Sequence, residues 1–195
     1  MPNVFNYLRI QAGPEVYSAA FAAIADDHAG PGSIDFNKIT PMPAWVYRGE
    51  LDSATLAARG KENCWRDWSL QNWGSEWNAM EPEACASAYD GGPGIYFITK
   101  SGDVRMLVDH LSRMYPEVYF DYLWANQDID KGAGALQYLD GVLTFSYLPE
   151  PGTKAAYDLA FDVLHANPAE YGMALDPMSG NYVWKGGERH GRRAH

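Results

Sequence analysis

The 195-residue chain has few of the residues that reactive or metal-binding sites need. Its two cysteines, Cys64 and Cys85, stand far apart and form no Cys-x-x-Cys pair, and its five histidines show neither His-x-His nor His-Glu-x-x-His spacing. Zinc sites and nucleophilic triads depend on such clusters, and no Gly-x-Ser-x-Gly sequence occurs either. The sequence therefore predicts two reduced thiols, no metal site and no cofactor.

Long apolar segments are also missing. No apolar run approaches the roughly 18 residues that a membrane-spanning helix needs. The first six residues, Met-Pro-Asn-Val-Phe-Asn, lack the basic segment and the apolar core of a secretory signal peptide. We therefore expect a soluble protein of the cytoplasm that does not bind a membrane.

Positive charge is scarce over most of the chain. The formal net charge is −10, of which residues 1–184 carry −13 and residues 185–195 carry +3. An acidic body repels a phosphate backbone, so direct nucleic-acid binding by residues 1–184 is disfavoured, whereas a basic protein surface is attracted. Ordinary solubility explains the same charge without any partner.

The hydrophobic residues, 47% of the chain, follow clear periods. Alternation predicts strands at 4–10, 95–99, 118–124, 133–139 and 142–148, with Asp140-Gly141 as a tight turn, and a short strand pair at 173–175 and 182–184. Three- and four-residue spacing predicts helices at 14–26, 104–115 and 153–166, and a cap at Asp52 or Ser53 predicts a short helix at 53–59. Residues 33–94 are the least regular part.

This order predicts one α+β domain over residues 1–184. We expect a ferredoxin-like antiparallel sheet with helices on one face, a Trp-rich insertion at about 33–94 and an added C-terminal helix. Residues 185–195, which are basic and almost without apolar side chains, are expected to form a flexible tail.

The segment 65–78 contains four tryptophans among polar residues. Because Trp combines a large apolar area with one N–H donor, such clusters anchor interfaces or stack on bases and sugars. The alternative is that the rings close the insertion onto the sheet while the asparagines bond to local backbone. The candidate binding residues are Trp68, Asn72, Trp73, Trp77 and Asn78.

Two carboxylates flank these tryptophans. Asp67 and Glu76 are the candidate catalytic residues, because an acid and a base near a ring-stacking floor are what glycoside hydrolysis needs. A chain with 25 acidic residues brings carboxylates near one another by chance, and the sequence does not set their separation. The sequence therefore favours a protein that is not an enzyme.

Three segments carry a family resemblance: the opening Met1-Pro2-Asn3, Phe36-Asn37-Lys38-Ile39-Thr40-Pro41-Met42-Pro43, and residues 68–79 with Asn-Trp-Gly-Ser-Glu-Trp-Asn at their centre. Together they resemble the YubB-type ferredoxin-like family, whose members are encoded largely on plasmids and phages. The resemblance runs over most of residues 1–148 and implies a fold and a mobile-element context, but no catalytic residues. The helix at 153–166 and the tail are additions to it.

From these observations we expect an accessory protein of a mobile element that binds a host protein, such as a nucleic-acid-binding defence factor, and modulates it. The alternative is an enzyme that acts on a nucleotide, nucleic acid or carbohydrate at a Trp-lined site containing Asp67 or Glu76. A third hypothesis is a homodimer formed by strand addition through residues 133–148.

Overall fold

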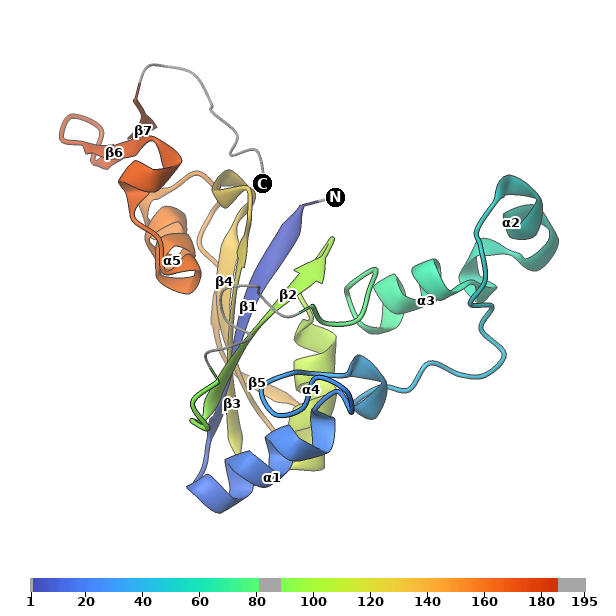
Figure 1. Cartoon of the computed structure of the whole chain (residues 1–195). Coiled ribbons are helices and arrows are strands. Elements are labelled where there is room, and N and C mark those ends of the chain that lie inside the picture. Colours follow the sequence, from blue (N-terminus) through green and yellow to red (C-terminus); the bar gives the residue numbers. More distant parts are fainter. Residues whose placement is uncertain (1, 81–88, 186–195) are drawn as a thin grey trace.

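The computed structural model describes residues 2–80 and 89–185 (Figure 1). Over these residues the chain is α+β, with one five-stranded antiparallel sheet in the order β2-β1-β3-β4-β5 and one separate hairpin. All the predicted strands are confirmed. Their bounds are Asn3–Gln11 (β1), Gly94–Lys100 (β2), Tyr119–Asn126 (β3), Ala133–Leu139 (β4), Val142–Tyr147 (β5), Met173–Asp176 (β6) and Asn181–Trp184 (β7).

The predicted helices are confirmed as well, and the structure adds one more. α1 spans Pro14–Ile24, α2 Ser53–Arg59, α4 Arg105–Met114 and α5 Lys154–Leu164. The addition is α3, Trp65–Asn72, inside the irregular region. Short 3-10 turns, Phe36–Lys38 (η1), Lys61–Asn63 (η2), Ile129–Lys131 (η3) and Pro168–Tyr171 (η4), complete the elements.

The sheet is covered by helices on both faces (Figure 1). α1 and α4 pack on one face against inward side chains of the four strands β1 to β4, and this is the larger core. α5 packs on the opposite face, where Phe161 belongs to a second cluster with Ala125 and Ala133. The sequence predicted helices on one face plus an added C-terminal helix; the added helix lies on the face that the others leave open.

Strand β1 explains why both faces need cover. Its even-numbered residues, such as Leu8 and Ile10, are fully buried in the larger core, whereas Phe5 points to the other side and packs against the α5 cluster. Buried side chains on one face and the partly buried Phe5 on the other both need a covering layer, and helices on the two sides of the sheet supply it. In the sheet, β1 lies between β2 and β3.

A buried polar network ties this centre together. The hydroxyl of Tyr122 donates to Asn6 Oδ1 at 2.7 Å and accepts the backbone N–H of Val104 at 2.9 Å, at the start of α4. The Asn6 amide in turn donates to Thr99 Oγ1 on β2. Burial raises the pKa of Tyr122 well above its ordinary value, since an ionised phenolate has no solvent there.

The β4–β5 hairpin turns where the sequence predicted. Asp140 and Gly141 have φ values of 50° and 70°, the left-handed conformation that an Asp-Gly pair adopts readily in a two-residue hairpin turn. Beyond the turn, β5 is the outermost strand and pairs with β4 alone among the described strands.

The predicted thiols and the predicted tail lie partly outside the described residues. Cys64 is a buried free thiol, as predicted, whereas Cys85 and the tail from residue 186 lie outside the described residues. Within residues 2–80 and 89–185, no helix has the length and the apolar character that crossing a membrane requires.

Candidate functional site

Residues 44–77 form a projection that stands away from the sheet and is called the arm here (Figure 1). It contains α2, η2 and α3, with α2 at its far end. None of the seven residues of α2, all of which the structure describes, is buried. The arm therefore places α2, a helix without a buried residue, away from both hydrophobic clusters.

Local capping accounts for α2. The side chain of Asp52 accepts the backbone N–H of Thr55 at 2.7 Å, which starts the helix, and Gly60 ends it with a φ of 80°. The hydrogen bonds from Thr55 lower the pKa of the Asp52 carboxyl, because they stabilise its ionised form. α2 is thus held by its caps rather than by packing.

The two sides of the arm are joined next to α2. The backbone N–H of Tyr47 donates to the Asn63 carbonyl, and the N–H of Trp65 donates to the Tyr47 carbonyl, both at 2.9 Å. The guanidinium of Arg59 lies 4.3 Å from the centre of the Tyr47 ring. These contacts join the segment before α2 to the segment after it. The two segments therefore form one unit with a defined surface.

The base of the arm is anchored by two of the predicted tryptophans. Trp68 and Trp73 are buried, with 7% and 4% of their surface exposed, and meet edge to face at 5.4 Å. Trp73 also contacts Phe36, and its indole N–H donates to the carbonyl of Thr40 at 2.8 Å. These two rings lie in the larger core and join the arm to it.

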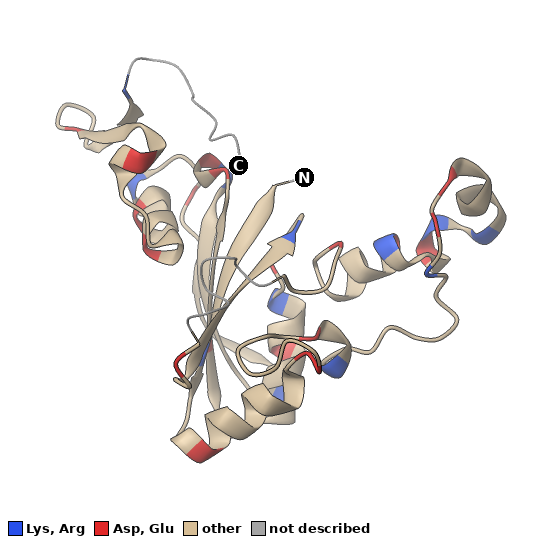
Figure 2. Cartoon of the chain, viewed as in Figure 1, with Lys and Arg blue, Asp and Glu red and all other residues tan. Residues whose placement is uncertain are grey.

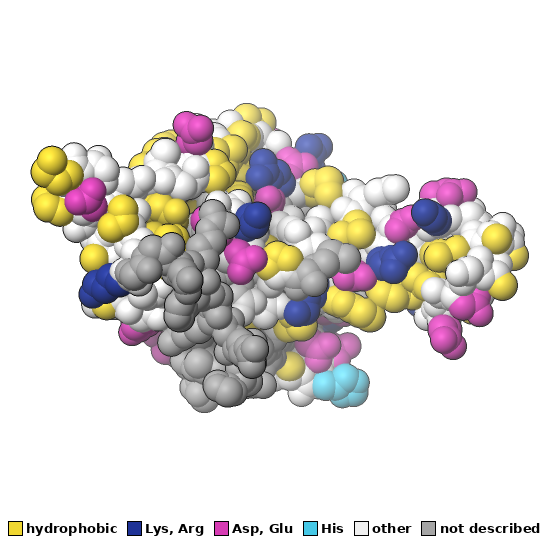
Figure 3. All heavy atoms as spheres, turned by 90° about the horizontal axis from the view of Figure 1, so that it is seen from above, with side chains coloured by type: hydrophobic (Ala, Val, Ile, Leu, Met, Phe, Trp, Pro, Cys, Tyr) yellow, Lys and Arg dark blue, Asp and Glu magenta, His cyan; other side chains and the backbone are white. Residues whose placement is uncertain are grey.

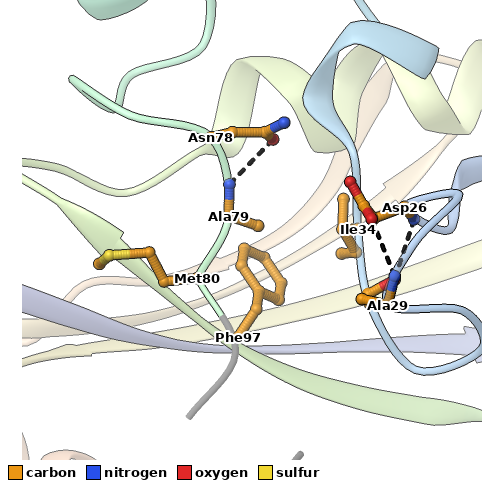
Figure 4. A pocket seen from close by; sticks show the side chains of 8 residues that line it. Asp26, Ala29, Ile34, Asn78, Ala79, Met80 and Phe97 are labelled. Carbon is orange, nitrogen blue, oxygen red and sulfur yellow. Dashed lines mark hydrogen bonds between the residues drawn. The ribbon is translucent and has the colours of Figure 1, made fainter.

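The two predicted asparagines bond to nearby backbone. The Asn72 amide donates to the carbonyl of Trp68, one helical turn earlier. Asn78 accepts the backbone N–H of Ala79 (Figure 4). It also accepts the backbone N–H of Phe36 and donates to Asp35. The hollow beside Asn78 has a volume of about 80 Å³, which suits a few waters rather than a ligand.

Close backbone approach fixes the arm against the start of α4. Gly74 has a φ of 83°, and a Cβ at this position would collide with the carbonyl of Asp103. The Ser69 hydroxyl donates to the carbonyl of Glu76, and the N–H of Glu76 donates to the carbonyl of Lys100 on β2. The arm is therefore bonded to the sheet edge at its base.

The arm also carries two exposed indoles, Trp45 and Trp77, and the partly buried Trp65. Trp77 is 49% exposed and stacks on Trp65, with ring centres 4.5 Å apart, and Trp45 is 62% exposed. The sequence predicted Trp77 as a binding residue but passed over Trp45, which follows Pro43-Ala44 where no helix or strand period would bury it. Of the five predicted binding residues, Trp77 is the one that is exposed.

The candidate catalytic carboxylates do not contact each other. Asp67 lies 3.9 Å from the guanidinium of its neighbour Arg66. No hydrogen bond among the described residues involves the Glu76 carboxylate or joins it to Asp67. In the same part of the chain, no group of three or more His, Cys, Asp or Glu side chains is arranged to hold a metal ion.

Charge distinguishes the arm from the remainder of the protein. Residues 44–77 contain four basic and five acidic residues, a net charge of −1, which leaves −9 for the rest of the chain. Both signs alternate along the arm (Figure 2), and hydrophobic side chains lie between them on its surface (Figure 3). The arm therefore offers a mixed apolar and charged surface rather than an acidic one.

A second surface lies on the sheet face beyond the end of α5. Two hollows of about 400 and 380 Å³ flank Tyr7, whose ring stacks on Tyr96 with centres 4.5 Å apart. The Tyr96 hydroxyl lies 2.6 Å from His165 Nε2, at the end of α5. Arg9 and Asp121 line the first hollow. This surface combines ring faces with charged groups.

Comparison of the chain with protein-family models, with curated proteins and with solved structures finds no match.

Proposed function

We propose that the protein is a binding module that docks onto another protein through the arm. The observation that carries this is the exposed indole surface of the arm: Trp45 is 62% and Trp77 49% exposed, and Trp77 stacks on Trp65, whose backbone N–H is bonded to Tyr47 on the other side of the arm. Trp is the residue type most enriched among energetically dominant interface positions.

The energetics of α2 support a partner. An isolated helix of seven residues is unstable in water, because its few hydrogen bonds do not offset the entropy lost in forming it. Helices in folded proteins gain most of their stability from a buried apolar face, and α2 has none. Contact with a second protein would supply that burial and would cover Trp45 and Trp77 at the same time.

The fold context of the proposal is a ferredoxin-like core. In support, β1, α1, the edge segment at Met80, β2, α4 and β3 follow one another in the chain, and Met80 exchanges two backbone hydrogen bonds with Ile98 on the outer edge of β2. The spatial order Met80 segment, β2, β1, β3 is that of a split β-α-β arrangement. β4, β5 and α5 extend this core.

The resemblance to the YubB-type family supplies the biological part of the proposal: an accessory protein of a mobile element that binds and modulates a host protein. The acidity outside the arm, −9, favours a partner with a basic surface, as nucleic-acid-processing and defence proteins have. The arm would provide the apolar anchor, and the acidic body would accelerate association.

The experiment is crosslinking followed by a binding measurement. A photoreactive residue at position 45 is compared with one at Met178, which is 93% exposed on the β6–β7 turn, in nuclease-treated lysate of a bacterial host. The partner crosslinked from position 45 alone is purified, and its affinity is measured for Trp45→Ala, Trp77→Ala and the control Met178→Ala. We expect the Trp variants to bind roughly thirtyfold more weakly, as for interface anchors. Equal affinity for all variants would contradict the proposal.

The sheet face favours a second candidate function, the binding of a small molecule with a planar ring. Hollows of about 400 Å³ are within the size range of ligand sites, and Tyr7 offers a ring face between them. Thermal shifts with nucleosides, nucleotides and sugars test this. Stabilisation that disappears in Tyr7→Ala but persists in Trp77→Ala would place the ligand on the sheet face; the reverse would place it on the arm.

A further inference from the structure

The outermost strand of the sheet is exposed along its whole length. All six residues of β5 are exposed, although β4 beside it alternates with a largely buried pattern. An ordinary edge strand buries one face on the core, and β5 buries neither. The strand therefore extends the sheet beyond the helices that cover β1 to β4.

The exposed side chains of this strand are apolar. Exposure is 61% for Val142, 48% for Leu143, 54% for Phe145, 43% for Tyr147 and 49% for Leu148, just after the strand. Residues 142–149 contain no charged side chain, in a chain whose formal charge is −10. Natural edge strands are usually protected by Lys, Pro or an inward charge, and β5 has none of these devices.

The two edges of the sheet differ in their backbone hydrogen bonding. On the outer side of β2, Glu76 and Met80 bond to Lys100 and Ile98. On the outer side of β5, no described strand is paired, so its outward N–H and C=O groups have no ladder partner there. The open edge, the apolar side chains and the missing charges thus coincide on one strand.

We propose that β5 pairs antiparallel with β5 of a second copy, joining two sheets into one continuous ten-stranded sheet. Antiparallel pairing of identical strands is two-fold symmetric and closes at two copies, because the other edge is already bridged. The uncharged strand lets two acidic chains meet without like charges in the contact. This dimer does not depend on the function proposed for the arm.

The exposed area is sufficient for a weak dimer. Five side chains of this size, each about half exposed, present roughly 100 Å² apiece, so two copies bury at most roughly 1,000 Å². This is near the lower limit for specific interfaces, so we expect a weak dimer. We expect a monomer at about 1 µM and a dimer at about 100 µM.

Light scattering after size exclusion across this concentration range tests the dimer. Phe145, near the centre of β5, is changed to Lys in one protein and to Glu in another, so that each variant repels its own copy in the pair. Val183→Lys, at an exposed apolar position of 43% on β7, is the control for adding charge to a strand. Circular dichroism checks that each variant is folded.

The expected result is that wild type and Val183→Lys form dimers, that Phe145→Lys and Phe145→Glu are each monomeric, and that an equimolar mixture of the two forms a heterodimer. Recovery in the mixture requires the two β5 strands to face each other. A wild-type monomer at about 100 µM, larger open assemblies, or a Phe145→Lys protein that still forms dimers would overturn the proposal.

Discussion

The most informative single comparison is between Trp73→Ala and Trp77→Ala, two tryptophans four residues apart in the same segment. Trp73 is 4% exposed, so its removal takes roughly 200 Å² of apolar surface out of the core and leaves the Thr40 carbonyl without its indole partner. Trp77 is 49% exposed and loses about half that area together with its stacking on Trp65. At about 25 cal/mol per Å², the upper limits are about 5 and about 2.5 kcal/mol.

We therefore expect Trp73→Ala to lower the free energy of unfolding by about 2 kcal/mol more than Trp77→Ala. With a urea dependence of about 2 kcal/mol per molar, the unfolding midpoints should differ by about 1 M. Urea titration followed by far-ultraviolet circular dichroism measures this difference. Equal midpoints would refute the division of the segment into a buried base and an exposed surface, and with it the use of Trp77→Ala as a binding probe.

Three further predictions test other parts of the structure. Tyr122→Phe should lower the free energy of unfolding by about 1–3 kcal/mol in urea titrations, because Asn6 Oδ1 loses its buried donor. Gly74→Ala should lower the free energy of unfolding by about 1 kcal/mol more than Gly180→Ala does. Both glycines have a positive φ, but only at Gly74 would a Cβ collide with backbone atoms. The Asp52 pKa is lowered in the folded state, so the cap that its carboxylate forms is complete above about pH 4 and is lost as the pH falls through that lowered pKa. The carbon chemical shifts of α2 should follow this loss of the cap. Asp52→Asn should remove the pH dependence of these shifts.

Much of the element order could be predicted because the local signals are strong. Proline at the start of α1, alternation along β1 and the Asp140-Gly141 turn each act within a few residues and do not depend on distant partners. α3 was not predicted, because its Trp68 is stabilised by contact with Trp73 and the larger core rather than by a helical period. The face on which α5 packs depends on the crossing of the chain over the sheet, which no local pattern encodes.

The candidate site could be predicted only in part. Sequence identified a Trp-rich segment but could not separate Trp68 and Trp73, which are buried, from Trp77, which is exposed. All lie within ten residues, and their burial is decided by whether the ring points to the arm's base or to solvent. Trp45 was not predicted as a binding residue because it is isolated in the sequence. Its exposure follows from the position of the arm away from the sheet.

The sheet also separates the two hydrophobic clusters, so that each packs as its own compartment on one face. The residues beneath α5, such as Phe161 and Met173, belong to one compartment, and those beneath α1 and α4 belong to the other. Because the larger compartment shares none of its buried side chains with α5, thermal fluctuations can open the C-terminal part while the rest stays closed. Amide hydrogens of residues 154–184 should therefore exchange with solvent as one cooperative unit, earlier than those of β1.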